Sequence, residues 1–255
     1  RAPCSCLCMS RLILIRHAQA TFSQDPLEAF EDYDQLSPLG LQQAEALGAE
    51  LVASGTVFDK VFVGPAVRHR QTMDAVASSY MRSEVPWPAP VLSEELAEHQ
   101  GARVVERAIA APDYGEDLIQ LAKSKVEQSN GEIDQTRMYF EVYRRVTRQW
   151  ARCELPASIE VEETWQAFRC RVESALHGIL EETGKGEAVG IVTSGGPVGC
   201  TVAWILGLDD EKALELAWVV QNATLTEVLF SGGRMSLKSF NVQPRMRVPE
   251  FATYV

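Results

Sequence analysis

The feature that most constrains the fold is a short apolar run that leads into two adjacent polar residues near the start of the chain. In the stretch RLILIRHAQAT, four apolar residues, Leu12 to Ile15, run directly into Arg16 and His17. An unbroken apolar run of this length is typical of a strand buried on both faces of a sheet. In open α/β sheets, ligands bind in the crevice at the carboxyl ends of the strands. The stretch therefore predicts either a ligand-binding pair at a strand exit or a buried strand that ends in two solvated residues.

Helices and strands alternate along much of the remaining chain. The segment SPLGLQQAEALGAELVASG predicts a helix that Ser37 caps, Pro38 begins and Gly55 ends. Gly and Pro punctuation and apolar runs predict further strands at 58–63, 91–92, 188–192, 223–230 and 235–242, and helices at 67–80 and 198–206. The last two strands flank a Ser-Gly-Gly turn, which favours a hairpin. This order indicates an α/β fold, a three-layer sandwich with a mainly parallel sheet.

The region between residues 101 and 182 has few strand signals. Its periodicity predicts helices at 117–128, 134–150 and 162–182. We expect residues from about 101 to 160 to form a helical insertion over the carboxyl edge of the sheet, within one domain that spans 9–255. Residues 1–8 precede a Met-Ser pair that resembles a natural start, so we interpret them as a leader or a remnant.

The composition limits the partners of the chain. Its 255 residues carry a formal net charge of −11, which argues against a general nucleic-acid partner, since phosphate backbones attract basic surfaces. No apolar run approaches the roughly 18 residues that a membrane span needs, so no membrane partner is expected. An acidic protein can still bind a small phosphorylated molecule through a local arginine cluster.

The cysteines indicate a reducing compartment. Cys4, Cys6 and Cys8 alternate without a second cluster, which makes a poor zinc site, and Cys153, Cys170 and Cys200 are scattered. We therefore expect reduced thiols and a cytoplasmic protein without a bound metal.

The Arg16–His17 pair resembles the Arg-His-Gly signature of the histidine phosphatase superfamily, which includes the cofactor-dependent phosphoglycerate mutases. Ala18 stands where that family has Gly. The resemblance extends from about Leu12 to Asn241, and Asn222 matches a recurrent structural Asn. It implies that His17 is the nucleophile, that Arg16 binds the phosphoryl group, and that neither a metal nor another cofactor is required.

Two later segments resemble further motifs of this family. The segment VGPAVRHRQT is similar to Ser-Pro-Leu-x-Arg-x-x-Gln-Thr, with Gly64 and Ala66 as substitutions, so Arg68 matches the second phosphate-binding arginine. A planar guanidinium suits two phosphate oxygens at once, although a solvated arginine at a helix start is the simpler interpretation, which we give to Arg70.

The segment VLSEELAEHQG is similar to the family's Leu-Asn-Glu segment, whose Glu is the general acid. We assign this role to Glu94, with Glu95 and Glu98 as competitors. A run of glutamates is also typical of a solvated face.

The segment IVTSGGP departs from the family pattern, Val-x-His-Gly-Gly, because Ser194 occupies the position of the second His. Its hydroxyl can donate one hydrogen bond but cannot carry positive charge. The amides of a glycine turn before a helix suit an anion, so we predict Ser194 and Gly195 as substrate-binding residues. Losing one stabilising donor commonly costs about 10²–10³ in rate, so the departure is compatible with weak activity as well as with none, and we expect Ser194→His to raise the rate.

The resemblance thus implies a metal-independent phosphatase that acts on a small phosphorylated metabolite through a phosphohistidine at His17. The alternatives are a phosphate-binding pseudoenzyme of the same fold, a phosphoglycerate mutase, and a serine hydrolase with Ser194 as nucleophile. Val192 stands where the nucleophile elbow of such a hydrolase has Gly. The oligomeric state is not indicated.

Overall fold

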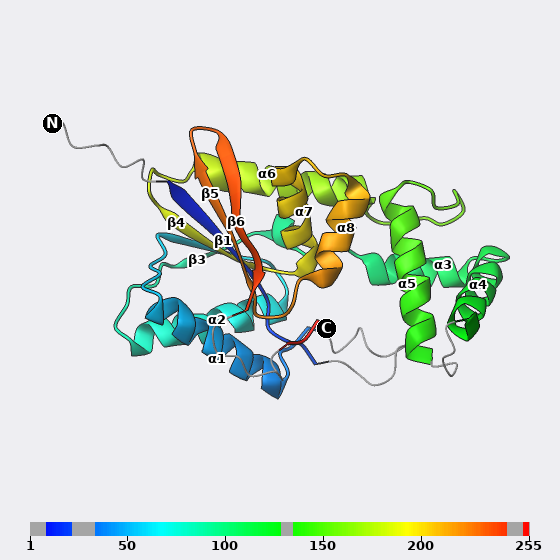
Figure 1. The fold of residues 1–255 in the computed structure, drawn as a ribbon, viewed down its shortest axis with the longest axis horizontal. Helices are drawn as coiled ribbons and strands as arrows, with labels where there is room; N and C mark the ends of the chain where they lie inside the picture. Colours follow the sequence, from blue (N-terminus) through cyan, green and yellow to red (C-terminus); the bar gives the residue numbers. More distant parts are fainter. Residues whose placement is uncertain (1–8, 22–33, 129–134, 244–251, 255) are drawn as a thin grey trace.

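A six-stranded sheet lies at the centre of the structure, a computed structural model that describes residues 9–21, 34–128, 135–243 and 252–254 (Figure 1). The strand order is β3-β2-β4-β1-β5-β6. The strands are β1 (Ser10–Arg16), β2 (Lys60–Val63), β3 (Pro90–Leu92), β4 (Ala188–Thr193), β5 (Leu225–Ser231) and β6 (Arg234–Val242). The first four are parallel, whereas β5 and β6 run antiparallel at one edge. The predicted α/β fold with a mainly parallel sheet and a late hairpin is confirmed.

Helices connect most of the strands. They are α1 (Pro38–Ala53), α2 (Val67–Arg82), the 3-10 helix η1 (Glu94–Leu96), α3 (Gly101–Ala110), α4 (Tyr114–Gln128), α5 (Gln135–Ala151), α6 (Trp165–Glu181), α7 (Gly195–Leu206) and α8 (Asp210–Val219). Within the described ranges, none of them combines the length and the apolar composition that crossing a bilayer would take.

The sheet has an apolar layer on each face. Along β1, the side chains of Leu12 and Leu14 enter a core cluster with residues of α6 and α7, whereas Ile13 and Ile15 enter a second cluster with residues of α1 and α2. Successive side chains of a strand point to opposite faces, so β1 is covered on both. Its two neighbours, β4 and β5, also complete its hydrogen bonding. The residues at its exit are therefore held by the centre of the fold.

The helices α3, α4 and α5 lie together beyond the sheet, on the right in Figure 1. Buried residues of all three, among them Val104, Leu118 and Val146, belong to the same core cluster as Phe168 of α6. The predicted helical region thus packs on the main core.

Two α-helices were not predicted from the sequence. Helix α3 starts at Gly101 without a side-chain cap, and its burial of Val104, Val105 and Ala108 shows that tertiary packing stabilises it. Helix α8 has a side-chain N-cap, because the Asp209 carboxylate accepts a hydrogen bond from the Lys212 amide at 2.8 Å. Helix α7 begins at Gly195, three residues earlier than expected, so the glycine turn is its first turn.

Candidate active site

The backbone of His17 is fixed at the exit of β1. Its amide donates to the Thr193 carbonyl of β4 at 2.8 Å, and its own carbonyl accepts from Asn222 Nδ2 and from the Ala223 amide, at 3.1 and 3.2 Å. The next amide, that of Ala18, donates to Thr72 Oγ1 of α2 at 3.0 Å. The position of His17 therefore depends on β4, on α2 and on the segment before β5. Asn222, expected to be structural, has a direct contact with the candidate nucleophile.

The imidazole of His17 is buried, and the contacts of its ring nitrogens indicate its tautomer. Nδ1 lies 2.7 Å from the Ala18 carbonyl, which can only accept, so Nδ1 carries the proton. Nε2 then has the lone pair and accepts from Arg68 Nε at 3.3 Å. Burial, followed by the charges of Arg68 and Arg16, holds the pKa of His17 well below its ordinary value. The site thus holds a neutral imidazole with a lone pair on Nε2, the form that can attack phosphorus.

Arg68 is at the start of α2, where its guanidinium also contacts Asp34. The distance from Arg68 Nη1 to Asp34 Oδ1 is 3.1 Å, and the same carboxylate oxygen accepts from the Val67 amide at 2.9 Å. Asp34 thus caps the helix and orients the arginine, a role that sequence reasoning missed. Arg70, predicted as solvated, is exposed.

Arg16 is buried beside His17 and its guanidinium is largely engaged by backbone carbonyls. One amino group donates to the Val220 carbonyl and the other to the Tyr254 carbonyl, the latter at 2.7 Å. Arg16 Nε has no hydrogen-bond partner among the described residues, and it lies 3.7 Å from where a Cβ on Gly195 would stand. This unsatisfied donor next to the glycine turn is the part of Arg16 that an anion there could use.

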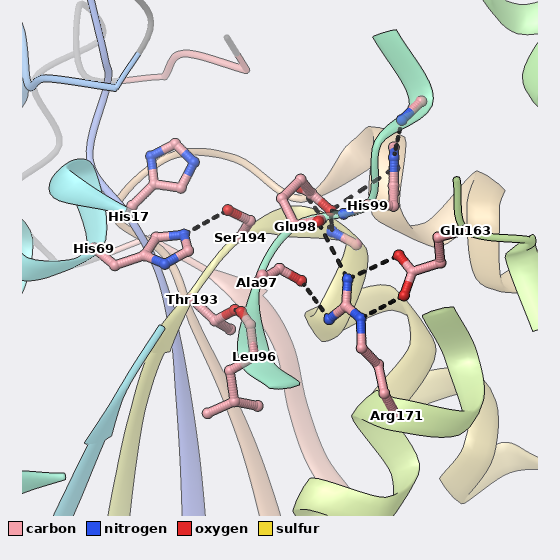
Figure 2. Close-up of polar contacts among 12 residues, drawn as sticks. His17, His69, Leu96, Ala97, Glu98, His99, Glu163, Arg171, Thr193 and Ser194 are labelled. Carbon is pink, nitrogen blue, oxygen red and sulfur yellow. Dashed lines mark hydrogen bonds and ion pairs between the residues drawn. The ribbon is translucent and has the colours of Figure 1, made fainter. Parts of the chain in front are cut away.

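The structure brings Glu98, and not Glu94, to the glycine turn. Glu94 is exposed on η1, and the neighbouring Glu95 is exposed as well. The Glu98 carboxylate accepts from the Gly196 amide at 3.1 and 3.2 Å and from the His99 amide at 2.9 Å (Figure 2). Burial raises its pKa, but His99, the two amides and Arg68 together outweigh this and leave the pKa below the ordinary value. Of the three glutamates considered, Glu98 is the candidate proton carrier.

Ser194 is the N-cap residue of α7 and is buried. Its Oγ lies 2.6 Å from Nε2 of His69, a residue of α2 that is also buried (Figure 2). The backbone of Ser194 is extended, with φ −106° and ψ 177°, and lacks the strain of a nucleophile elbow. This geometry argues against the serine-hydrolase interpretation.

His69 was not singled out from the sequence, although a signal existed. It shares the buried face of α2 with Thr72, Met73 and Val76, at the spacing i, i+3, i+4 and i+7. The ring centroids of His17 and His69 are 5.6 Å apart. A histidine on an inward helix face beside a candidate nucleophile is a candidate site residue.

The described residues contain no cluster of three or more His, Cys, Asp or Glu side chains that could hold a metal ion. What the site does contain is a neutral imidazole, two arginines, the first amides of α7 and a carboxylate. Such a set suits an anion with several oxygens.

The sequence matches the profile of a known family, and the fold is similar to several solved structures. The sequence profile of the histidine phosphatase superfamily (branch 1) matches residues 12–113 and 125–243. The fold is similar to that of a phosphoserine phosphatase mutant from Entamoeba histolytica, solved in complex with phosphoserine. The two sequences are 16% identical, the match covers 93% of this chain and 100% of that chain, and the TM-score is 0.58.

The fold is also similar to that of the alpha-ribazole phosphatase of Shigella flexneri. The two sequences are 19% identical, the match covers 91% of this chain and 96% of that chain, and the TM-score is 0.56. A third similar structure is a phosphoglycerate mutase from Bacillus anthracis str. Sterne. Its sequence is 16% identical, the match covers 92% of this chain and 94% of that chain, and the TM-score is 0.56. At these identities the solved structures establish the common fold.

Proposed function

The chain belongs to the histidine phosphatase superfamily, and we propose on this premise that it hydrolyses a small phosphorylated metabolite through a phosphohistidine at His17, without a metal. The observation that carries the proposal is the state of His17. A buried imidazole whose Nδ1 faces the Ala18 carbonyl, and whose Nε2 accepts from Arg68, is a preorganised nucleophile beside positive charge.

In the first step, His17 Nε2 attacks the phosphorus, the N–P bond forms, and the bond from phosphorus to the leaving oxygen breaks. The leaving oxygen takes a proton from Glu98. Glu98 is a carboxylate in the free site, and the negative charge of the incoming phosphoryl group raises its pKa so that a proton is taken up with the substrate. Arg68 and the Nε of Arg16 stabilise the charge on the phosphoryl oxygens.

In the second step, water attacks the phosphorus while the Glu98 carboxylate accepts its proton, and the N–P bond breaks. Inorganic phosphate leaves, and His17 returns to its neutral form. Glu98 thus regains from water the proton that it gave to the leaving oxygen.

The test is a screen of phosphomonoesters, with phosphate release as the readout, in buffer that contains EDTA. We expect release by the wild type, none by His17→Ala, and unchanged release by His177→Ala, a matched control at an exposed histidine on α6. Protein that is denatured at alkaline pH during turnover should carry a phosphate on the peptide that contains His17, and this phosphate should be stable in alkali and released in acid. A metal requirement, or equal activity of His17→Ala, would refute the proposal.

A second candidate is a phosphate-binding protein without turnover. The observation that favours it is the engagement of both Arg16 amino groups by the carbonyls of Val220 and Tyr254. Binding of orthovanadate by a wild type that yields neither phosphate nor phosphohistidine would support this candidate. A mutase would instead convert a phosphoglycerate into its isomer without net release of phosphate.

A further inference from the structure

The contact between His69 and Ser194 joins two elements that are far apart in the sequence. His69 is on α2 and Ser194 precedes α7, yet the hydroxyl and the ring nitrogen are 2.6 Å apart and both side chains are buried. Figure 2 shows the His69 ring beside His17, with Ser194 between His69 and Glu98. The pair therefore lies inside the candidate active site, next to the nucleophile.

The ring of His69 occupies space that only a glycine leaves open. A Cβ at Gly64 would lie 2.4 Å from His69 Nδ1 and 2.9 Å from Cε1, closer than atoms can approach. Gly64 is a position where the family's second motif has Ser, and position 194 is where the family has its second His. Two of the departures from the family pattern, at positions 64 and 194, thus adjoin one imidazole, that of His69.

The charges around His69 come from several elements. Arg68 and Arg70 of α2 and His17 after β1 face it, and Glu98 lies beyond Ser194. Burial, followed by the charge of Arg68, holds the pKa of His69 well below its ordinary value, while the Gly64 backbone opposes this shift. In the free site the ring is neutral. Nε2 of this neutral ring shares a hydrogen bond with the Ser194 hydroxyl, whereas the buried Nδ1 has no hydrogen-bond partner among the described residues.

We propose that His69 and Ser194 together replace the missing second imidazole of the site. When a phosphoryl group enters, His69 takes up a proton, its Nε2–H donates to Ser194 Oγ, and the Ser194 hydroxyl turns to donate to a phosphoryl oxygen. The hydroxyl then contacts the phosphoryl group, and the imidazolium behind it supplies the positive charge. His69 is a positioning residue in this scheme, and its effect on turnover rests on the proposed phosphatase function.

This arrangement reverses the expectation from sequence that Ser194→His accelerates turnover. Ser194 Oγ already lies at hydrogen-bond distance from the His69 ring, so a longer side chain in the same direction enters the volume of that ring. We expect Ser194→His alone to be slower than the wild type. The same substitution should be beneficial once His69→Ala has vacated the space.

The first experiment is an exchange of imidazoles between the two positions. We expect His69→Gln, which keeps a hydrogen-bonding group but cannot be protonated, to lower kcat by about 10²-fold with a smaller change in KM, as for the loss of one stabilising donor. His69→Ala should be at least as slow, and His69→Ala combined with Ser194→His should recover most of the loss. Wild-type activity of His69→Gln, or a Ser194→His variant faster than the wild type, would overturn the proposal.

The second experiment needs no turnover, so it separates this proposal from the proposed function. Side-chain NMR of ¹⁵N-histidine-labelled protein, assigned with His69→Gln, reports the protonation of the His69 ring with and without orthovanadate. We expect a neutral ring in the free protein and an imidazolium in the orthovanadate complex. A His69 ring that stays neutral on addition of excess orthovanadate would overturn the inference even if His17 proves to be the nucleophile, whereas an imidazolium would support it even in a protein that shows no phosphatase activity.

Discussion

The backbone amide of Gly196 donates to both carboxylate oxygens of Glu98, at 3.1 and 3.2 Å. A carboxylate thus sits on the first turn of α7, where the helix dipole and free amides favour negative charge. The approach is possible because residue 196 has no side chain, since a Cβ there would lie 2.0 Å from Glu98 Oε1. The Gly196 amide thus binds an anionic group in the free site, as amides at a helix N-terminus commonly do.

Gly196→Ala is therefore expected to displace Glu98 and to lower kcat/KM by about 10²-fold, a cost that small displacements of a reacting group can have. The matched control is Gly178→Ala, on the exposed side of α6 with open space around it. That substitution should raise the free energy of unfolding by about 0.5–1 kcal/mol, because alanine is the better helix former. Steady-state kinetics and urea unfolding of both variants measure the two effects, and equal kinetics in the two variants would contradict the steric argument.

Glu98→Gln is expected to lower kcat by about 10²–10⁴-fold on substrates with a poor leaving group, because the amide can neither give nor take the proton. The loss should be much smaller for a substrate such as an aryl phosphate, whose leaving oxygen needs no proton. Glu94→Gln, at the exposed position on η1, should show no such dependence on the leaving group. If Glu94→Gln depended on the leaving group in this way and Glu98→Gln did not, the general acid would be Glu94.

The two buried histidines make the stability depend on pH in a defined direction. The pKa values of His17 and His69 are held well below the ordinary 6.5, so below that pH the unfolded chain binds protons that the folded protein does not. The free energy of unfolding therefore decreases as the pH falls below about 6.5, by up to about 1.4 kcal/mol per pH unit for each histidine.

Urea unfolding between pH 5 and 7 measures this slope, and His69→Gln should reduce it by about half. The lowered pKa of Glu98 lies below its ordinary 4.5, so its stabilising contribution is lost only at lower pH and does not interfere. A stability that does not change over this range would show that the two imidazoles are charged or solvated in the folded protein.

The sequence by itself was sufficient for the elements that depend on local patterns. The apolar run of β1, the Ser37 cap of α1 and the hairpin of β5 and β6 follow from periodicity and turn chemistry over a few residues, and all three occur as expected. The positions of His17 and Arg68 could also be anticipated, because each lies next to a strand end or a helix start. Parallel strands place such positions at one edge of the sheet.

The tertiary structure alone decided which side chains meet at that edge. That Glu98, and not Glu94, contacts the Gly196 amide depends on how the chain after β3 passes α7, and the spacing of the three glutamates in the sequence does not indicate this path. The pairing of His69 with Ser194 joins residues 125 positions apart, across a gap that exists because Gly64 lacks a side chain. Short-range sequence patterns determine where helices and strands form. Contacts between side chains of distant segments depend instead on how closely those segments pack, and this packing exists only in the folded chain.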